Sequence, residues 1–431
     1  MSSWKTKLDR LDGGPPRRAS SESATPPAKP EGADAPAEPS PARPSLDALR
    51  DRVAAILART TQPAPRRVET REVERGAALP FDTEETPLGP LHTRTWRLSP
   101  AHRVGRAPVA AWGEASPAML ALLALDPALA ACDPARALFV DTETTGLAGG
   151  TGTVPFLIGL AWLEEEGRLC VEQLLVRQLG EEAPALARLG ERVTASSMLV
   201  SFNGKSFDLP LLRTRRVMAR LPPLDDRPHL DLLHVARRVH RGRLGGYGLG
   251  ALEAEVLGFE RDGDIPSAEI VSRYAHYLRT GDESVLLAVV EHNAWDVISM
   301  PALAALYGEP LGGLEAGDLV GVARTLRRAR ALGEAEAMAQ AAVDRGAGDP
   351  GLRVRGEIAK ARGDRSSALA DFSALVGGVD DPALRLELAK LYEHHARDPL
   401  AALAMVERGT GEGPEATERR RARLLRRPRK G

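Results

Sequence analysis

Two acidic side chains follow a short apolar run near residue 140. The run covers residues 137–140, and Asp141 and Glu143 come directly after it. Such a run is typical of a buried strand, and side chains two positions apart on a strand project from the same face. Two adjacent carboxylates repel unless a cation lies between them, and oxygen ligands favour Mg²⁺ or Mn²⁺ over Zn²⁺. Taken alone, the pair is more typical of a solvated strand end than of a metal site.

Three more candidate side chains come from later stretches. A second apolar run, residues 198–202, ends at Asn203, and Asp208 lies at the start of the helix predicted after it. His292 and Asp296 are four residues apart in a long helical pattern and therefore share a face. Singly, Asp208 fits a helix cap and the His/Asp pair fits a surface contact. Their order along the chain, with the strand acids first and the helix pair last, points to a single site.

These three stretches resemble the exonuclease motifs of the DEDD (DnaQ-like) 3′-5′ exonucleases, most closely the YprB-type ribonuclease-H-like proteins. The matching segments, residues 141–146, 203–208 and 292–296, read DTETTG, NGKSFD and HNAWD. The resemblance covers about residues 80–310 and extends to the segments 149–153 and 156–159. It implies a ribonuclease-H-like sheet and hydrolysis of phosphodiester bonds by a two-metal mechanism.

The same resemblance implies a role for each candidate side chain. Asp141, Glu143, Asp208 and Asp296 would hold two Mg²⁺ or Mn²⁺ ions, and His292 would accept the proton of the attacking water. The substrate would be the 3′ end of a single-stranded nucleic acid. In the DEDDh branch the His precedes the last Asp by five residues, whereas here the gap is four, at which the DEDDy branch carries Tyr. The sequence therefore supports the ligand role of Asp296 more strongly than the base role of His292.

Other apolar runs predict the strands that carry these side chains. The predicted strands cover residues 137–142, 155–163, 169–176 and 198–202. A tight turn at Glu166-Gly167 makes two of them antiparallel, whereas strands separated by helices are normally parallel. We therefore predict an α/β fold in which a mixed sheet is flanked by helices, over residues 137–312.

The rest of the chain divides into four further regions by composition. Residues 1–66 are predicted to be a disordered leader with a short amphipathic helix after Ser45. Residues 67–136 are predicted to be an extended lead-in, with pieces at 91–98 and 104–111 that extend the sheet. Residues 313–412 form Ala/Leu-rich helix pairs that resemble tetratricopeptide repeats, an all-α helical-repeat region, and residues 413–431 form a basic tail. The repeats fit either a surface for another protein or simple packing onto the catalytic domain.

Positive charge is the next feature that bears on nucleic acid. The chain has 431 residues and a formal net charge of −1, so it has no general basic field, and binding would depend on local basic faces. The candidates for nucleic-acid binding are Asn203, Lys205, Arg213 and Arg216, and Arg237, Arg238 and Arg241 follow on the next predicted helix. Because arginine is frequent throughout the chain, a solvated face is equally consistent.

Two glycine-rich stretches invite other interpretations. Gly204-Lys205-Ser206 looks like the end of a phosphate loop, but that motif requires glycine where this chain has Leu199. The glycines of residues 245–250 fit a connector and a substrate-facing loop equally well. Asp231, just before a predicted helix, fits both a helix-start acid and a residue that orients the site.

Composition also bears on location and class. The chain has only two cysteines, Cys132 and Cys170, which argues against a disulfide framework or a zinc cluster and fits a reducing cytoplasm. No stretch is a candidate membrane span or secretory signal. We therefore predict a cytoplasmic, metal-dependent 3′-5′ exonuclease that acts on single-stranded nucleic acid and can bind a protein partner through its repeats. The alternative is a non-catalytic adaptor in which the ribonuclease-H-like fold is a scaffold and the repeats bind proteins.

Overall fold

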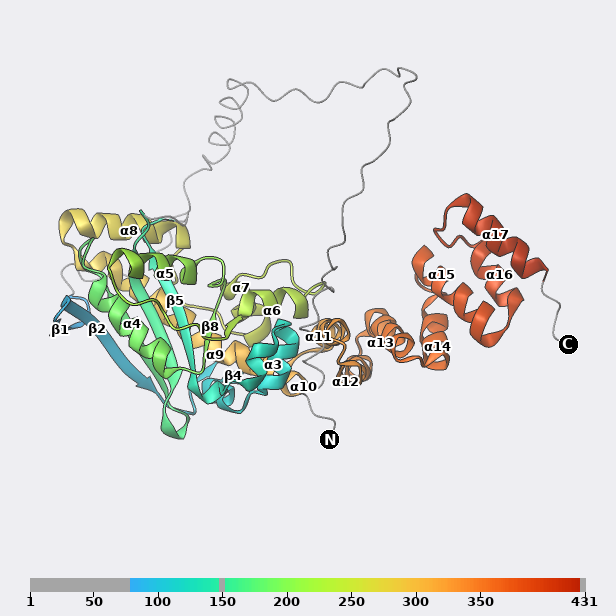
Figure 1. The fold of residues 1–431 in the computed structure, drawn as a ribbon, viewed down its shortest axis with the longest axis horizontal. Coiled ribbons are helices and arrows are strands. Elements are labelled where there is room, and N and C mark those ends of the chain that lie inside the picture. The colour runs from blue at the N-terminus through green and yellow to red at the C-terminus, as the bar shows by residue number, and fades with distance from the viewer. Residues whose placement is uncertain (1–77, 147–151, 427–431) are drawn as a thin grey trace, which may run out of the picture. The chain divides into compact units, whose positions relative to one another are not determined.

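The computed structural model describes residues 78–146 and 152–426 (Figure 1). The leader predicted for residues 1–66 lies outside the described residues. So do residues 149–151 of the glycine-rich segment and the last five residues of the predicted tail.

Seven strands of the described chain form one mixed sheet. They are β1 (Asp82–Thr86), β2 (Gly89–Leu98), β5 (Ala137–Thr144), β6 (Pro155–Leu163), β7 (Leu169–Leu175), β8 (Met198–Ser201) and β9 (His229–Asp231), in the spatial order β1-β2-β7-β6-β5-β8-β9. Strands β5, β8 and β9 are parallel, and the other neighbours are antiparallel. The turn at Glu166 and Gly167, both with positive φ, joins β6 to β7. The predicted mixed sheet is confirmed.

The lead-in to the sheet differs from the prediction in one part. Strand β2 pairs with β7 and extends the sheet, as expected of residues 91–98. Residues 104–111 were expected to extend it too, and this was wrong. They hold only the short strands β3 (Arg103–Val104) and β4 (Ala107–Pro108), which pair with each other, and then a 3₁₀ helix, Val109–Glu114. Pro108 has no N–H group to continue a ladder, and the 3₁₀ helix buries Trp112 fully.

Helices cover both faces of the sheet. They are α3 (Pro117–Ala124), α4 (Ala183–Ala195), α5 (Asp208–Met218), α6 (Leu232–Val239), α7 (Leu249–Leu252), α8 (Ser267–Thr280) and α9 (Leu287–Gly308). Side chains of β5 alternate between two cores: Phe139 packs with residues of α3, α6 and α9, and Val140 packs with residues of α4, α5 and α8. Because Asp141 and Glu143 share the parity of Phe139, β5 directs both acids to the face that α9 covers.

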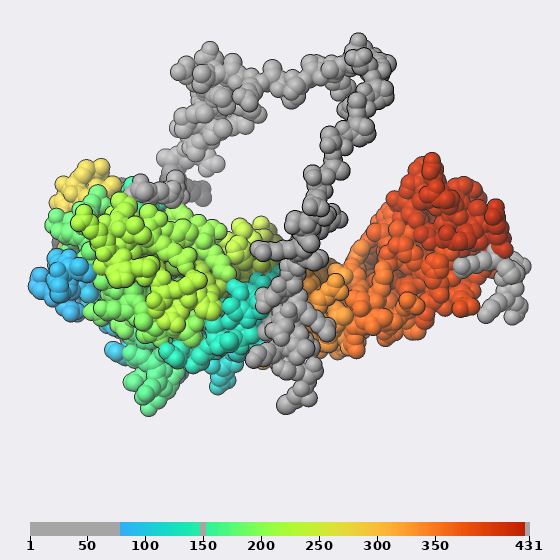
Figure 2. Space-filling view, viewed as in Figure 1, coloured from blue at the N-terminus to red at the C-terminus, as the bar shows by residue number. Residues whose placement is uncertain are grey.

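The C-terminal part of the described chain is all helical. Its helices are α10 (Pro310–Gly313), α11 (Ala316–Arg328), α12 (Leu332–Asp344), α13 (Gly348–Arg362), α14 (Arg365–Leu375), α15 (Pro382–Leu391), α16 (Pro399–Glu407) and α17 (Pro414–Leu425). Figure 2 shows this part in orange and red. Buried residues of α11, α12 and α13 belong to the same core as α9, so the helical region continues the core of the sheet-bearing part.

A buried polar network holds α11 against the end of α6. Asp318 is fully buried and accepts hydrogen bonds from Arg243 Nε at 2.6 Å and Arg243 Nη2 at 3.0 Å. His240 contacts Asp318 through Nδ1 at 2.7 Å and the Tyr307 hydroxyl through Nε2 at 2.9 Å. At the same crossing a Cβ on Gly321 would lie 1.9 Å from the carbonyl oxygen of Val239, so the two backbones touch there.

The segment predicted as a basic tail differs from that prediction over most of its length. It forms helix α17, whose arginines are paired within the chain. Arg420 Nη1 lies 3.0 Å from Glu393 Oε2, and Arg423 Nε lies 2.6 Å from Glu393 Oε1. Within the described residues, no helix is both long and apolar enough to cross a membrane.

Candidate metal and active site

Strand β5 and helix α9 bring the first pair of acids and the last Asp together. The Asn293 side chain of α9 is fully buried and donates from Nδ2 to Asp141 Oδ2 at 2.9 Å. Gln173 of β7 donates from Nε2 to Asn293 Oδ1 at 3.0 Å and to the carbonyl oxygen of Val290 at 2.8 Å. Asn293 therefore fixes the orientation of Asp141 and joins three elements behind the site.

Gly159 of β6, the partner of Asp141 in the ladder, leaves the space for this contact. A Cβ added there would lie 2.4 Å from Asn293 Oδ1 and 2.9 Å from its Cγ. Gly159 belongs to the segment 156–159 that shares the family resemblance, and its contact with Asn293 gives a physical reason for glycine there.

Replacing Gly159 with Ala is expected to displace Asn293 and to free Asp141. Overpacking a buried position of this kind costs about 1 to 3 kcal/mol, which thermal unfolding measures directly. The matched control is Gly333→Ala, because nothing lies within 4 Å of a Cβ at that helical position. An unchanged melting temperature in Gly159→Ala would show that the neighbouring side chains accommodate the methyl group.

Asp208 reaches the site from the start of α5. It is buried, and its Oδ1 accepts a hydrogen bond from Thr142 Oγ1, a neighbour of both strand acids. The turn before it is held by Asp231, which accepts from the backbone N–H groups of Asn203 at 3.0 Å and Lys205 at 3.1 Å. Asp231 also accepts from Leu233 N at 3.1 Å as the N-cap of α6. It therefore has both roles that the sequence left open, helix start and support of the site.

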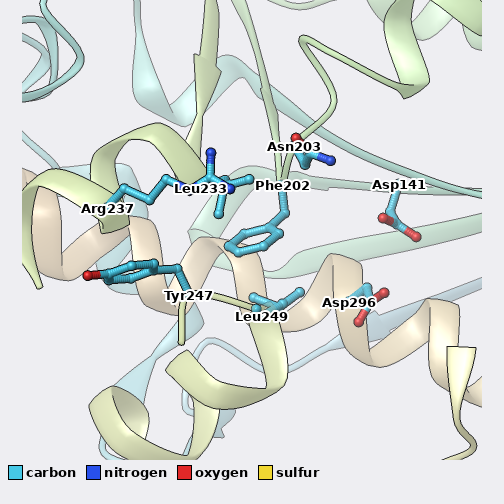
Figure 3. A pocket seen from close by; sticks show the side chains of 9 residues that line it. Asp141, Phe202, Asn203, Leu233, Arg237, Tyr247, Leu249 and Asp296 are labelled. Carbon is cyan, nitrogen blue, oxygen red and sulfur yellow. The ribbon is translucent and has the colours of Figure 1, made fainter. Parts of the chain in front are cut away.

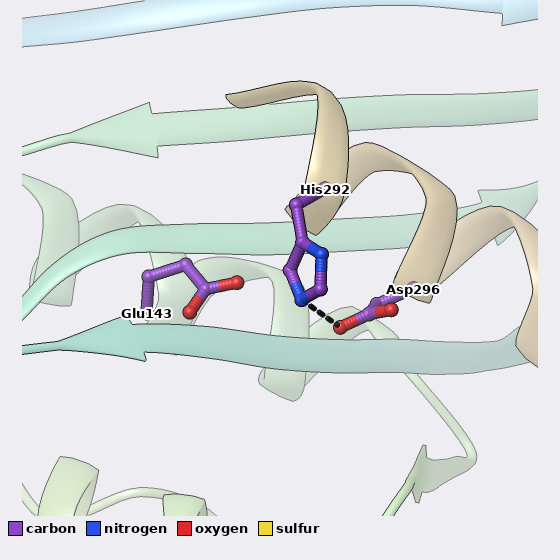
Figure 4. A group of neighbouring side chains, drawn as sticks. All are labelled: Glu143, His292 and Asp296. Atoms are coloured by element: carbon purple, nitrogen blue, oxygen red, sulfur yellow. Dashed lines mark ion pairs between the residues drawn. The ribbon is translucent and has the colours of Figure 1, made fainter. Parts of the chain in front are cut away.

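Helix α9 presents His292 and Asp296 one turn apart. His292 Nε2 lies 3.7 Å from Asp296 Oδ2. Glu143 completes a group in which one ligand atom from each residue lies within 4.8 Å of the others (Figure 4). The spacing of four residues thus lets His292 and Asp296 face the same acid of β5.

The loop between α7 and α8 adds two residues that the sequence analysis missed. Arg261 donates from Nη2 to Asp296 Oδ1 at 2.5 Å and makes two 2.7 Å hydrogen bonds to Glu253. Asp264 Oδ1 lies 2.6 Å from His292 Nδ1. Glu253 begins a π-helical turn, Glu253–Leu257, a feature common at functional sites. The loop reads RDGD, which resembles an ordinary turn, so its sequence gave no signal of these contacts.

Burial, together with the charges of neighbouring acids, raises the pKa of three of the acids. Burial, followed by the charge of Asp296, raises the pKa of Glu143 to about 8. Burial and the charges of Asp296 and Glu143 raise the pKa of Asp141 well above its usual range. Burial raises the pKa of Asp208 to about 6, against the hydrogen bond from Thr142.

The pKa of His292 is raised by the neighbouring acids. Burial lowers the pKa of His292, but the charge of Asp296 and the hydrogen bond to Asp264 outweigh it, so the net shift is upward. Four carboxylates and one imidazole thus lie close together, fully or partly buried, and the guanidinium of Arg261 contacts one of them. This donor set, rich in oxygen and short of positive charge, fits a divalent cation such as Mg²⁺ or Mn²⁺.

A cavity of about 430 Å³ opens beside the acids. It is lined by Asp141, Phe202, Asn203, Leu233, Arg237, Tyr247, Gly248, Leu249 and Asp296. Figure 3 shows Phe202 and Leu249 between the two acids and the more distant Arg237 and Tyr247. The glycine-rich loop of residues 245–250 therefore faces the cavity, one of the two alternatives that its sequence left open.

The four residues predicted to bind nucleic acid have different surroundings. Asn203 lines the cavity in a left-handed conformation, with φ of 67°. Lys205 Nζ lies 3.5 Å from Asp126, and the exposed Arg213 lies 3.2 Å from Asp226. Arg216 is buried, donates from Nε to the carbonyl oxygen of Pro222 at 2.8 Å, and also donates to that of Leu186. The structure therefore gives Arg216 a packing role in place of the predicted one, and the arginine that lines the cavity is Arg237.

Comparison with known proteins agrees with this arrangement. The family model described as the RNase_H superfamily matches residues 138–307. The sheet-bearing part of the chain is ribonuclease-H-like. The matched residues include the site, all of β5 except its first residue and all of α9 except its last.

Two individual matches accompany the family model. The chain is 39% identical to the uncharacterized protein YprB of Bacillus subtilis (strain 168) over 167 residues, which are 38% of this chain and 40% of that protein. It also matches the structure of the family B DNA polymerase from the hyperthermophilic archaeon Pyrobaculum calidifontis, with 14% identity and a TM-score of 0.34, over 52% of this chain and 29% of that chain. The chain thus spans less than half the length of either protein.

Proposed function

We propose that this protein is a metal-dependent nuclease, a 3′-5′ exonuclease that hydrolyses phosphodiester bonds at the ends of single-stranded nucleic acid. One observation carries the proposal. The four acids Asp141, Glu143, Asp208 and Asp296 converge with His292 beside a cavity, within a ribonuclease-H-like domain.

In this proposal each residue has a defined task. Asp141, Glu143, Asp208 and Asp296 hold two Mg²⁺ or Mn²⁺ ions, which when bound activate water and stabilise the leaving oxygen. Asn293 keeps Asp141 aimed at the shared space, and Arg261 holds Oδ1 of Asp296 so that Oδ2 faces His292. Thr142 orients Asp208 in the same way.

His292 is proposed to accept the proton of the attacking water at Nε2. Its Nδ1 lies 2.6 Å from Asp264, and an N–H at Nδ1 leaves Nε2 as the acceptor in the neutral ring. Asp264 is then a positioning residue. The arrangement supports a base role for His292 although it precedes Asp296 by four residues.

The cavity supports a nucleotide as the occupant of the site. Its size falls in the range of pockets that hold small organic ligands, and its wall combines aromatic and aliphatic side chains with one arginine. Phe202 and Tyr247 can stack on a base, and Arg237 can pair with a phosphate. An unpaired terminal nucleotide satisfies both contacts.

The non-catalytic adaptor has less support from the site. Buried carboxylates that repel one another destabilise a protein, and an adaptor gains nothing from keeping them. All four acids are present among the described residues, and burial together with the charge of Asp296 raises the pKa of Asp141, Glu143 and Asp208. The adaptor would be favoured if capture of a protein partner required residues 315–410 but tolerated loss of Asp141.

Divalent cations are expected to raise the melting temperature, and more strongly at about pH 8.5 than at about pH 5.5. Because the pKa of Glu143 is about 8 and that of Asp208 about 6, both acids hold protons at low pH that a cation must displace. As the pH rises they ionise and repel, so the metal-free protein loses stability that a cation restores. Mg²⁺ or Mn²⁺ at a hundredfold excess over its Kd would add about 2.7 kcal/mol.

Thermal unfolding with and without MgCl₂ or MnCl₂ measures this effect without a substrate. Asp262→Asn is the matched control, since Asp262 is exposed and makes no side-chain hydrogen bond or ion pair with any described residue. A melting temperature that no divalent cation changes at either pH would argue against a metal site.

A further inference from the structure

An arginine cluster lies where α6 crosses α11, and we call its members the junction arginines. They are Arg237, Arg238, Arg241, Arg324, Arg327, Arg328 and Arg353. The first three lie on or just after α6, the next three on α11 and the last on α13 (Figure 1). From them we infer a binding surface for the sugar–phosphate backbone of a single-stranded nucleic acid, which rests on the proposed function and extends it beyond the cavity.

The crossing of the two helices brings the arginines together. At the contact between Gly321 and Val239 the backbones touch, so residues one turn away on either helix flank the crossing. Arg324 and Arg328 are four residues apart and therefore share a face of α11. Arg237 lies on α6, and Arg241 follows it by four residues, just beyond the end of that helix.

The mutual influence of these charges shows that they are neighbours. Burial lowers the pKa of Arg238, and the charge of Arg328 lowers it further across the crossing. Although Arg324 is exposed overall, the protein atoms packed around its guanidinium lower its pKa, and the attraction of Glu357 opposes this shift. The charges of Arg353, Arg327 and Arg241 add to that downward shift.

Among the described residues, these seven arginines have only two ion-pair partners, Glu357 and Asp381, and Asp381 pairs with Arg353. Glu357 Oε2 lies 2.9 Å from Arg327 Nη2, and its Oε1 lies 3.4 Å from Arg353 Nε. Arg241, Arg324 and Arg328 are exposed and form no ion pair with any carboxylate of the described residues. In a chain whose total charge is −1, such a local excess of cations is a marked departure and fits a polyanion.

The surface is continuous with the cavity. Arg237 lines the cavity together with Asp141 and Asp296, and Arg241, four residues later, lies close enough to Arg324 of α11 for its charge to act on that residue. A strand whose 3′ end lies at the acids can therefore pass from Arg237 to Arg241 and on to Arg324 and Arg328. Guanidinium groups bind phosphates whatever the base, so the surface is expected to bind long strands more tightly than short ones without distinguishing their sequences.

Charge reversal on α11 tests the surface. Binding of a 5′-fluorescein-labelled oligothymidylate or oligouridylate of about 20 nucleotides is measured by anisotropy in EDTA, where hydrolysis does not interfere. For the double variant Arg324→Glu/Arg328→Glu we expect the affinity to fall by about tenfold or more. We also expect the slope of log K against log salt concentration to become shallower by about 1 to 2. Arg324→Gln/Arg328→Gln is expected to show an intermediate loss.

The matched control is Arg168→Glu/Arg279→Glu. These arginines are also exposed, and both double variants make the same change in total charge. An equal loss in both would show that only total charge matters, and no loss in Arg324→Glu/Arg328→Glu would show that the strand runs elsewhere. Either result overturns the inference. If Arg324→Glu/Arg328→Glu does not fold, the folded Arg324→Gln/Arg328→Gln variant decides, and binding by it at the wild-type affinity also overturns the inference.

The assay separates this inference from the proposed function. Because binding is measured without metal, strand binding that depends on the junction arginines in a protein that cleaves nothing would refute the exonuclease and leave the surface intact. A wild-type protein that binds neither oligonucleotide but captures an acidic protein through these arginines would overturn the choice of nucleic acid as the partner.

Discussion

Replacing Asp141 with Asn is expected to lower the rate of metal-dependent cleavage by about a thousandfold or more, equivalent to about 4 kcal/mol of transition-state stabilisation. The change removes one carboxylate charge from the proposed metal site. It preserves shape, because the amide oxygen of Asn can still accept the hydrogen bond from Asn293. Initial rates on a single-stranded oligonucleotide with Mg²⁺ or Mn²⁺ measure the loss.

A second property distinguishes this prediction from damage to the fold. Since burial and the charges of Asp296 and Glu143 raise the pKa of Asp141, removing its charge relieves repulsion. The metal-free Asp141→Asn protein is therefore expected to melt at or above the wild-type temperature at about pH 8.5. Asp262→Asn, an exposed aspartate of the nearby loop, is the control and should keep the wild-type rate. Wild-type cleavage by Asp141→Asn would remove Asp141 from the catalytic site.

Replacing Asp318 with Ala is expected to have the largest effect on stability, about 3 to 5 kcal/mol. Asp318 is fully buried between His240 and Arg243, and its loss leaves a guanidinium and an imidazole without their acceptor. Because this network holds α11 against α6, the variant is also expected to loosen the junction between the ribonuclease-H-like domain and the C-terminal helices.

Thermal unfolding and limited proteolysis measure the effect. Glu315→Ala is the matched control, because Glu315 is exposed at the start of the same helix and its side chain makes no capping hydrogen bond. A wild-type melting temperature in Asp318→Ala would mean that water or a neighbouring side chain replaces the carboxylate, and that the network contributes little to stability.

Sequence periodicity was sufficient to predict the strands that carry the chemistry. The prediction for residues 155–163 coincides with β6, Pro155–Leu163, and that for 137–142 lies within β5. Such strands are buried on both faces and appear as continuous apolar runs, and the period of two then places Asp141 and Glu143 on one side. The prediction for residues 104–111 was wrong because a short apolar run does not distinguish a strand from a 3₁₀ helix that buries one large side chain, here Trp112.

The contacts around the acids depend on tertiary packing that spacing does not reveal. Arg213 and Arg216 lie three residues apart on α5, which predicted a shared basic face. Helix α4 covers only one of them: a Cβ on Gly190 would lie 2.6 Å from Arg216 Nη1, so that glycine provides the space in which the guanidinium is buried. Arg261 and Asp264 come from a loop, where no repeating pattern of residues predicts which way the side chains point.

Spacing also failed to reveal the contacts of Asn293, although this residue lies within the segment 292–296 that resembles the third exonuclease motif. It lies between His292 and Asp296 in the sequence, and nothing in the spacing of that segment singles it out. Its importance follows from Gly159 on β6 and Gln173 on β7, two residues that are more than a hundred positions away. The pairing of β5, β6 and β7 places Gly159 and Gln173 near Asp141, and the packing of α9 on these strands adds Asn293.

The most direct test of the proposed function is digestion of 5′-end-labelled single-stranded DNA and RNA with Mg²⁺ or Mn²⁺, comparing the wild-type protein with Asp141→Asn. The account predicts a ladder that shortens from the 3′ end in the wild type, and no ladder with EDTA or in Asp141→Asn. Intact strands of both polymers after incubation with folded, metal-bound wild-type protein would contradict it, and so would equal digestion by the two proteins.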